Sequence, residues 1–429
     1  MINTTEKIIN ILKEEIVPAE GCTEPIALAY AASHMTKIFG RIPDKMKVYL
    51  SGNMIKNVKS VHIPNSKGKV GIEYAVAMGA ILGDSSKELM VIYNIDTSRL
   101  DEVKKYVDEK RIGIYLEDEC PKLYIRIDGT SKDDKGTVEI SDYHTNLTKL
   151  IKNGENILQN NNVNGNNNDI INDRDFLSAD LIYDTAKNID IKDIEHIFDN
   201  VIKYNSAIAE EGLKNTYGIA IGKTIKEGME DGFYGKDLKN ELSSYASAGS
   251  DARMNGCPLP VMTTSGSGNQ GMTCSLPIIR YCQIKNRSKE DMIRGLFFSH
   301  LTTIHIKSEI GRLSAYCGAM AASASVSGAL AFLDGLSLAQ IKMAIENTLG
   351  TLSGVICDGA KSSCATKIAI GISAAVDGYY AAKKNRKLLF GEGIIGRDVE
   401  KTIENVGILG SKGMKETDKV ILDIMLNNK

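Results

Sequence analysis

The sequence predicts an α+β protein with two unequal parts. Strand and helix patterns alternate within residues 1–152, which is typical of an α+β domain with a small, mostly antiparallel sheet. From 175–429 the apolar residues recur with the helical period almost throughout, so we expect an all-α domain. The stretch 153–174 between them is polar and rich in Asn, cannot bury a core, and predicts a flexible boundary.

Within the first part, apolar positions predict an amphipathic helix over residues 3–17 that ends at Pro18. A second helix is expected to begin near Pro25, with Thr23 as its cap, and to reach Met35. The remaining elements expected here are a strand, a loop and a short strand across 47–64, helices over 71–83 and 98–109, and strands over 89–95, 111–117, 122–128 and 135–142.

The second part predicts a series of helices, which lie near 176–187, 190–211, 213–230, 235–250, 278–285, 288–303, 304–312, 338–352, 366–383 and 396–406. Residues 313–333 carry no charge and resemble a membrane span in length. They consist mostly of Ala, Ser and Gly, whose transfer into lipid is weakly favourable beside a Leu-rich span. We therefore expect a buried central helix.

Composition narrows the class of partner. The chain has 52 basic and 54 acidic residues, a formal net charge of −2, and no basic run, so we expect no nucleic-acid partner. The N-terminus lacks a charged segment followed by an apolar core, so we expect a cytoplasmic protein with reduced cysteines and no membrane partner. The extent of small-residue helix surface favours a homodimer.

Three of the eight cysteines form a spaced set: Cys317, Cys357 and Cys364. A short loop of Asp, Gly, Ala, Lys and Ser between the last two would let their thiolates turn toward one point. Three converging thiolates in a reduced protein indicate an iron–sulfur cluster with one iron left open, whereas a structural zinc site usually needs a fourth ligand. Burial as small apolar residues is the alternative, since no tight Cys-x-x-Cys is present.

Cys22 lies just before a predicted helix. The partial positive charge at a helix N-terminus lowers a thiol pKa and favours the thiolate, so Cys22 is a candidate catalytic residue. The alternative is a buried cysteine in a capping turn.

The segment 263–271 is rich in glycine, hydroxyl and amide groups. Such a loop can aim backbone N–H groups at a carboxylate or phosphate, although no Walker sequence is present and a flexible turn is the alternative. The candidate substrate-binding residues in it are Ser265, Gly266, Ser267, Gly268, Asn269 and Gln270.

Four further polar residues are candidates for substrate binding. Lys307 and Arg312 precede Cys317 and can pair with a carboxylate, or both can be solvated. Asn53 follows a predicted strand and could reach a ligand, or simply satisfy a turn. His144 at a strand end could face a cleft, with a surface histidine as the alternative.

The combination of these motifs is more specific than any one of them. The segments 20–25, 264–271, 306–318 and 357–364 resemble the L-cysteine desulfidase family, which is related to the iron–sulfur L-serine dehydratases through its helical domain. The resemblance runs over nearly the whole chain. It implies a 4Fe–4S cluster held by Cys317, Cys357 and Cys364, with one iron not ligated by cysteine, and a catalytic role for Cys22, either as the base or in another way, such as a sulfur acceptor.

The resemblance also implies degradation of the amino acid L-cysteine to hydrogen sulfide, ammonia and pyruvate. The remaining cysteines match no ligand position and are expected to be structural; they are Cys120, Cys257, Cys274 and Cys282. One alternative is an iron–sulfur L-serine dehydratase, and another is a non-catalytic sulfur carrier or redox sensor. A pyridoxal-phosphate enzyme would need a Schiff-base lysine in a recognisable context, and no lysine stands out.

Overall fold

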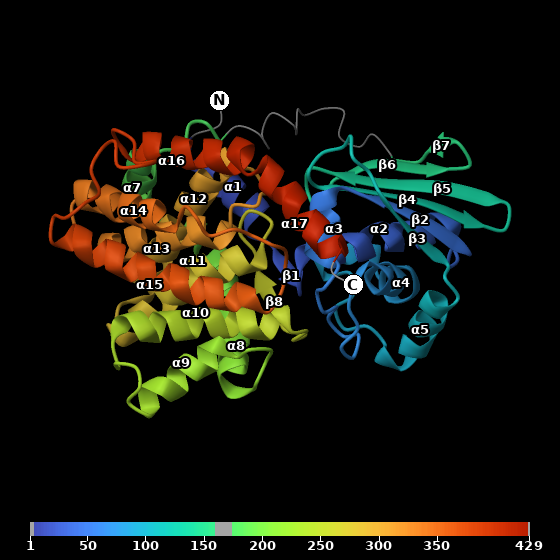
Figure 1. Cartoon of the computed structure of the whole chain (residues 1–429), viewed down its shortest axis with the longest axis horizontal. Coiled ribbons are helices and arrows are strands. Elements are labelled where there is room, and N and C mark those ends of the chain that lie inside the picture. Colours follow the sequence, from blue (N-terminus) through green and yellow to red (C-terminus); the bar gives the residue numbers. More distant parts are fainter. Residues whose placement is uncertain (1–3, 159–173, 428–429) are drawn as a thin grey trace.

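The computed structural model describes residues 4–158 and 174–427 of the 429-residue chain. A sheet with helices on one side lies beside a larger body of packed helices (Figure 1). Within the described residues the main sheet has the order β3-β2-β4-β5-β6-β7, in which β2 and β3 pair in parallel and the other neighbours are antiparallel. The predicted α+β class with a mostly antiparallel sheet is confirmed.

The first part of the chain supplies the main sheet, the helices that cover it, and α1, which packs into the helical part instead. Its helices are α1 (Thr4–Glu15), α2 (Thr23–Phe39), α3 (Gly52–Val58), α4 (Ile72–Leu82) and α5 (Leu100–Asp108), with short 3-10 helices at Ser85–Met90 and Thr97–Arg99. Its strands are β1 (Pro18–Glu20), β2 (Lys45–Leu50), β3 (Ile112–Leu116), β4 (Tyr124–Ser131), β5 (Asp134–Ser141), β6 (Leu147–Lys152) and β7 (Glu155–Asn156).

Two of the predicted strands are wrong. The loop expected after the first strand of 47–64 is helix α3, because the Ser51 side chain accepts a hydrogen bond from the backbone N–H of Met54 and starts a helix directly after β2. The short strand expected after it is reduced to a turn and a single bridge between His62 and Val70. The strand expected over 89–95 is a 3-10 helix followed by turns, because the Asp84 carboxylate caps the N–H of Ser86. At Asp84 a local cap outweighs the apolar pattern.

Helix α2 forms the middle layer between the sheet and α4 (Figure 1). The side chain of Met35 lies against Gly129 of β4 and Gly136 of β5, which pair with each other. A Cβ at Gly129 would lie 2.8 Å from the Met35 sulfur, so these two glycines admit the helix close to the sheet. Helix α2, which begins beside Cys22, is therefore fixed by packing along its length.

The second part is helical apart from strand β8 (Pro260–Met262). Its helices are α7 (Ala179–Asn188), α8 (Glu195–Lys214), α9 (Ile221–Glu230), α10 (Leu238–Met254), α11 (Gly268–Ile284), α12 (Lys289–Ile310), α13 (Gly318–Leu333), α14 (Leu338–Leu352), α15 (Ser363–Lys383), α16 (Val399–Ile408) and α17 (Lys415–Asn427). Helix α13 packs against α11, α12, α14 and α15, which confirms the predicted buried central helix. Among the described residues, no helix combines the length and apolar character needed to cross a membrane.

Three connections join the two parts. Strand β1 pairs with β8 in antiparallel register, so that Pro18 lies opposite Met262. Side chains of α1 pack into the core of the helical part. At the other end of the chain, α17 returns to pack on α3, where Gly52 leaves room for Leu422. These contacts bring the start of α2 and the cysteine-bearing segments to the boundary between the two parts.

Candidate active site

A short backbone pairing brings Cys317 and Cys357 together. Cys317 is the N-cap residue of α13, and Cys357 lies in the loop after α14. The backbone N–H of Cys317 donates to the carbonyl of Val355 at 3.2 Å, and that of Cys357 donates to the carbonyl of Ala315 at 2.6 Å. This bridge holds the two cysteines on adjacent chain segments.

The loop between Cys357 and Cys364 packs against α3. Gly359 has a φ of +99°, and a Cβ there would lie 2.6 Å from the carbonyl oxygen of Lys56. The Lys56 ammonium donates to the carbonyl of Cys357 at 3.3 Å. Cys364 lies in the first turn of α15, and its Sγ donates to the Gly359 carbonyl at 3.7 Å. A glycine and a lysine therefore set the path of the loop.

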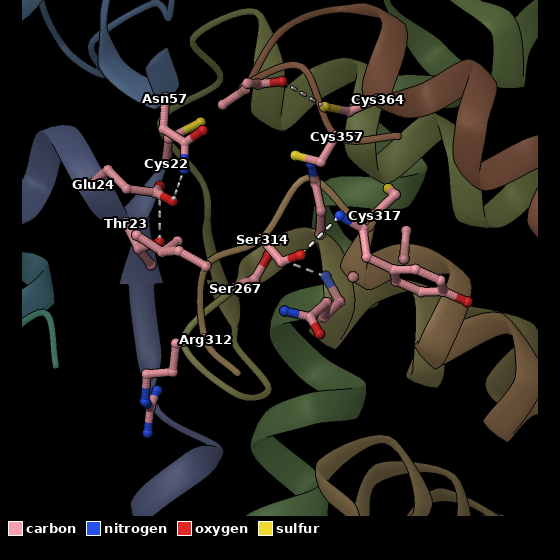
Figure 2. A pocket seen from close by; sticks show the side chains of 18 of the residues that line it. Cys22, Thr23, Glu24, Asn57, Ser267, Arg312, Ser314, Cys317, Cys357 and Cys364 are labelled. Carbon is pink, nitrogen blue, oxygen red and sulfur yellow. Dashed lines mark hydrogen bonds between the residues drawn. The ribbon is translucent and has the colours of Figure 1, made fainter. Parts of the chain in front are cut away.

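The three cysteines and Cys22 line one cavity at the seam between the two parts. Figure 2 shows Cys317, Cys357 and Cys364 along one side and Cys22 across from them, beside Asn57. The other lining residues are Thr23, Glu24, Arg253, Ser267, Asn269, Gln270, Lys307, Arg312, Leu313, Ser314, Tyr316, Gly318, Ala319, Gly359, Ala360 and Ile368.

The chemistry of the three cysteines fits a cationic group bound among them. Burial, followed by the nearby thiols of Cys357 and Cys364, raises the pKa of Cys317 to about 12. Burial and Cys357 raise the pKa of Cys364 to about 11. Thiolates at these positions therefore repel one another unless a positive group lies between them.

A single metal ion does not match this geometry. Within residues 4–158 and 174–427, no three His, Cys, Asp or Glu side chains lie close enough to hold one ion. The cysteines that bind an iron–sulfur cluster each ligate a different iron, so their sulfur atoms stand apart by the width of the cluster.

Cys22 is the N-cap residue of α2 and is 2% exposed. Its thiol approaches the sulfur of Met254 at 4.0 Å. Burial raises the pKa of Cys22 to about 12; the charge of Arg253 lowers it and that of Glu24 raises it. The predicted lowering of this pKa is wrong, because loss of hydration outweighs the partial charge at the helix N-terminus.

Beside Cys22, three polar side chains form a network that sequence reasoning missed. The Asn57 amide N–H donates to Glu24 Oε1 at 2.9 Å, and the Thr23 hydroxyl lies 3.2 Å from Glu24 Oε2. The Thr23 hydroxyl also donates to the carbonyl of Gly266 at 2.9 Å, which links this network to the glycine-rich loop (Figure 2). The sequence signal was the acid within the segment 20–25, next to Cys22.

The glycine-rich loop contributes side chains to the cavity through the start of α11. Ser267 caps this helix by accepting from the N–H of Gln270 at 3.4 Å, and Ser267, Asn269 and Gln270 all line the cavity. The N–H groups of Thr264 and Ser267 are already bonded to each other's carbonyls across the turn. The expected row of free backbone donors is therefore partly used within the loop.

Three other residues of this loop are not among the lining residues of the cavity. Ser265 and Gly266 have φ of +49° and +75° and form the turn, and Ser265 lines a neighbouring cavity with Lys307 and Arg312. Gly268 packs against the side chain of Arg253. These three residues therefore set the backbone path of the glycine-rich loop.

Lys307 and Arg312 both line the cavity, and neither is simply solvated. Lys307 is 5% exposed, its ammonium donates to the Arg312 carbonyl at 3.4 Å, and burial lowers its pKa to about 8. The Arg312 guanidinium pairs with Glu15 at 2.9 Å and lies 3.8 Å from the ring centroid of Tyr143. Arg312 is thus already neutralised, at the edge of the group drawn in Figure 2.

His144 and Asn53 lie outside this cavity. His144 is a buried histidine behind Gly266, and burial lowers its pKa to about 4, so it is neutral. The surface-histidine alternative is therefore excluded. Asn53 is half-buried on α3, whereas Asn57, one turn later, faces the cavity.

Arg253 is the charged lining residue that sequence reasoning passed over. It lies in the last turn of α10, whose residues from Leu242 to Met254 are buried, and is itself 3% exposed. The signal available in the sequence was an arginine within a helix of small residues. Such a helix is expected to be buried, and a buried charge requires a partner or a ligand.

A profile of the serine dehydratase alpha chain family matches residues 86–423. The chain belongs to the serine dehydratase alpha chain family. Its relatives include UPF0597 proteins from Fusobacterium nucleatum, 55% identical over 98% of both chains, from Desulfitobacterium hafniense, 42% identical over 98% of this chain and 96% of that one, and from Lachnoclostridium phytofermentans, 41% identical over 98% of this chain and all of that one.

Membership in the serine dehydratase alpha chain family confirms the predicted relation to serine dehydratases. The family match contains Cys317, Cys357 and Cys364 together with the glycine-rich loop and Lys307. Cys22 and Glu24 precede the matched residues, and the UPF0597 relatives extend the similarity to 98% of the chain.

Proposed function

We propose that the protein is a carbon–sulfur lyase that degrades L-cysteine to hydrogen sulfide, ammonia and pyruvate by α,β-elimination. The observation that carries this proposal is the placement of Cys22 on the same cavity as Cys317, Cys357 and Cys364. The four sulfur-bearing residues come from both parts of the chain, and the family relation to serine dehydratases supports a lyase.

Cys317, Cys357 and Cys364 would hold a 4Fe–4S cluster, because these three cysteines line one cavity and would become thiolates together only with a cationic group among them. Such a cluster, when bound, supplies an open Lewis-acidic iron for the substrate's leaving group.

Residues of the cavity would bind the substrate and remove its proton. Ser267, Asn269, Gln270 and Lys307 form a polar wall that receives the α-carboxylate and stabilises charge that develops next to it. Cys22 would remove the proton from Cα as its thiolate, the form that the positive charge of Arg253 favours against burial. The Cα–H electron pair forms the Cα–Cβ double bond as the Cβ–S bond breaks. The resulting 2-aminoacrylate takes up water and yields pyruvate and ammonia, with one hydrogen sulfide released per L-cysteine.

L-serine is a second candidate substrate. The name of the matching family, serine dehydratase alpha chain, favours it, and the same cavity would eliminate water in place of hydrogen sulfide. A thiol at position 22 supports L-cysteine as the first choice.

The test is pyruvate formation by protein purified without oxygen, with L-cysteine and L-serine supplied in parallel. We expect the larger kcat/KM for L-cysteine, with equal amounts of sulfide and pyruvate. Cys22→Ser should abolish turnover and keep bound iron, while Cys282→Ser, at a buried cysteine near the end of α11, should keep both. Full turnover by Cys22→Ser would exclude this residue as the base, and a larger kcat/KM for L-serine would make the protein a dehydratase.

A further inference from the structure

Arg253 is a buried cation that no other described side chain neutralises. It is 3% exposed, and within residues 4–158 and 174–427 its side chain takes part in no hydrogen bond or ion pair. Its Nε is shielded from solvent and without an acceptor. Burial of an unpaired guanidinium is strongly unfavourable, so the site is incomplete without an anion.

The surroundings of Arg253 add a second positive feature. A Cβ at Gly268 would lie 2.6 Å from Arg253 Cζ, so the guanidinium occupies the space that a side chain would fill at the first residue of α11. The N-terminus of that 17-residue helix carries partial positive charge. A guanidinium and a helix N-terminus at one place repel each other unless an anion lies between them.

The opposite charge is found beside Cys22 on the same cavity. Glu24 is held by Asn57 and Thr23, as described above. Because the Asn57 amide nitrogen donates to Glu24, its Oδ1 is the free end, and this atom is buried with no partner. A carboxylate and an unused amide oxygen together suit an ammonium group.

We propose that this cavity binds the zwitterionic head of an α-amino acid, with the α-carboxylate on Arg253 and the α-ammonium on Glu24 and Asn57. The inference rests on the proposed function for the identity of the cavity as the substrate site. It goes further because it names the two charged anchors. Arg253 joins the polar wall at the carboxylate, where the sequence had suggested Arg312, which is already paired with Glu15. The side-chain group at Cβ is left to face the cysteines.

The experiment measures binding of L-alanine, which has both charged groups and no leaving group, to protein purified without oxygen. Isothermal titration should detect L-alanine and show much weaker binding of ethylamine and propionate, which each lack one charged group. Arg253→Gln should weaken L-alanine binding by about 10- to 100-fold, the usual range for loss of a charged hydrogen-bond partner. Arg253→Lys should restore part of it, and Glu24→Gln should also weaken binding.

Arg280→Gln is the matched control, because Arg280 pairs with Glu241 on the surface of α11 and should leave binding unchanged. The inference would be overturned if wild type did not bind L-alanine. It would also be overturned if Arg253→Gln bound L-alanine as tightly as wild type. If circular dichroism shows that Arg253→Gln does not fold, then full-strength binding by Arg253→Lys and Glu24→Gln would overturn it instead. Arginine-dependent L-alanine binding without any pyruvate formation would uphold this inference and refute the proposed elimination.

Discussion

The ion pair between Lys56 and Asp418 is expected to hold the cysteine segments in place. The Lys56 ammonium on α3 lies 2.5 Å from Asp418 Oδ1 on α17, and their side chains are 2% and 12% exposed. Asp418 Oδ2 accepts the backbone N–H of Ala315 at 3.1 Å, and Lys56 also donates to the Cys357 carbonyl. Asp418→Asn leaves a buried ammonium without its counter-charge, which costs about 3–5 kcal/mol in comparable buried pairs.

Urea denaturation followed by circular dichroism, under anaerobic conditions, measures this cost. The control is Asp377→Asn, whose partner Lys239 forms an exposed pair that should contribute about 0–1 kcal/mol. We also expect Asp418→Asn to lose bound iron more readily than wild type, because the backbone of both cysteine segments is released. A free energy of unfolding for Asp418→Asn within the range of the control, together with full retention of iron, would refute this reasoning.

Three further predictions follow from local geometry. Gly359→Ala should destabilise the loop and lower iron content, since φ is +99° and the Cβ would lie 2.6 Å from the Lys56 carbonyl; iron equal to wild type would contradict this. Burial raises the pKa of Asp251 to about 7, so the folded state holds this proton more tightly than the unfolded state does. The free energy of unfolding should therefore fall as pH rises from about 4 to about 7. In urea titrations at several pH values, Asp251→Asn should make this dependence on pH weaker. Gly79→Ala should lower the melting temperature, because its Cβ would collide with the Ala29 backbone where α4 crosses α2; an unchanged melting temperature would count against that packing.

Periodicity was enough to predict the α+β class, the helical second part and the buried helix α13, because these depend on local apolar spacing. The spaced cysteine set was visible in the sequence, but the contact that brings Cys317 beside Cys357 is a bridge between Tyr316 and Ile356, which closes the hairpin of α13 and α14. A local cap at Ser51 accounts for the helix found where a loop was expected, and one at Asp84 accounts for the 3-10 helix at the start of the wrongly predicted strand over 89–95.

Features that depend on distant parts of the chain were out of reach of the sequence. The pairing of Arg312 with Glu15 joins residues 297 positions apart. The burial that raises the pKa of Cys22 comes from packing between the two parts, so the helix-terminus rule alone gave the wrong sign. The importance of Arg253 depends on its having no partner, which becomes visible only when every neighbour is placed.

The central claim is that Cys317, Cys357 and Cys364 together hold an iron–sulfur cluster. The most direct measurement is the iron and acid-labile sulfide content of anaerobically purified wild type and of the three single alanine variants. Cys120→Ala is the control, since this half-buried thiol donates to the Glu117 carbonyl and lies outside the cavity. The account predicts about four irons per chain in wild type and the control, and loss of the cluster in each of the three variants. Wild type without iron, or iron retained by all three variants, would contradict it.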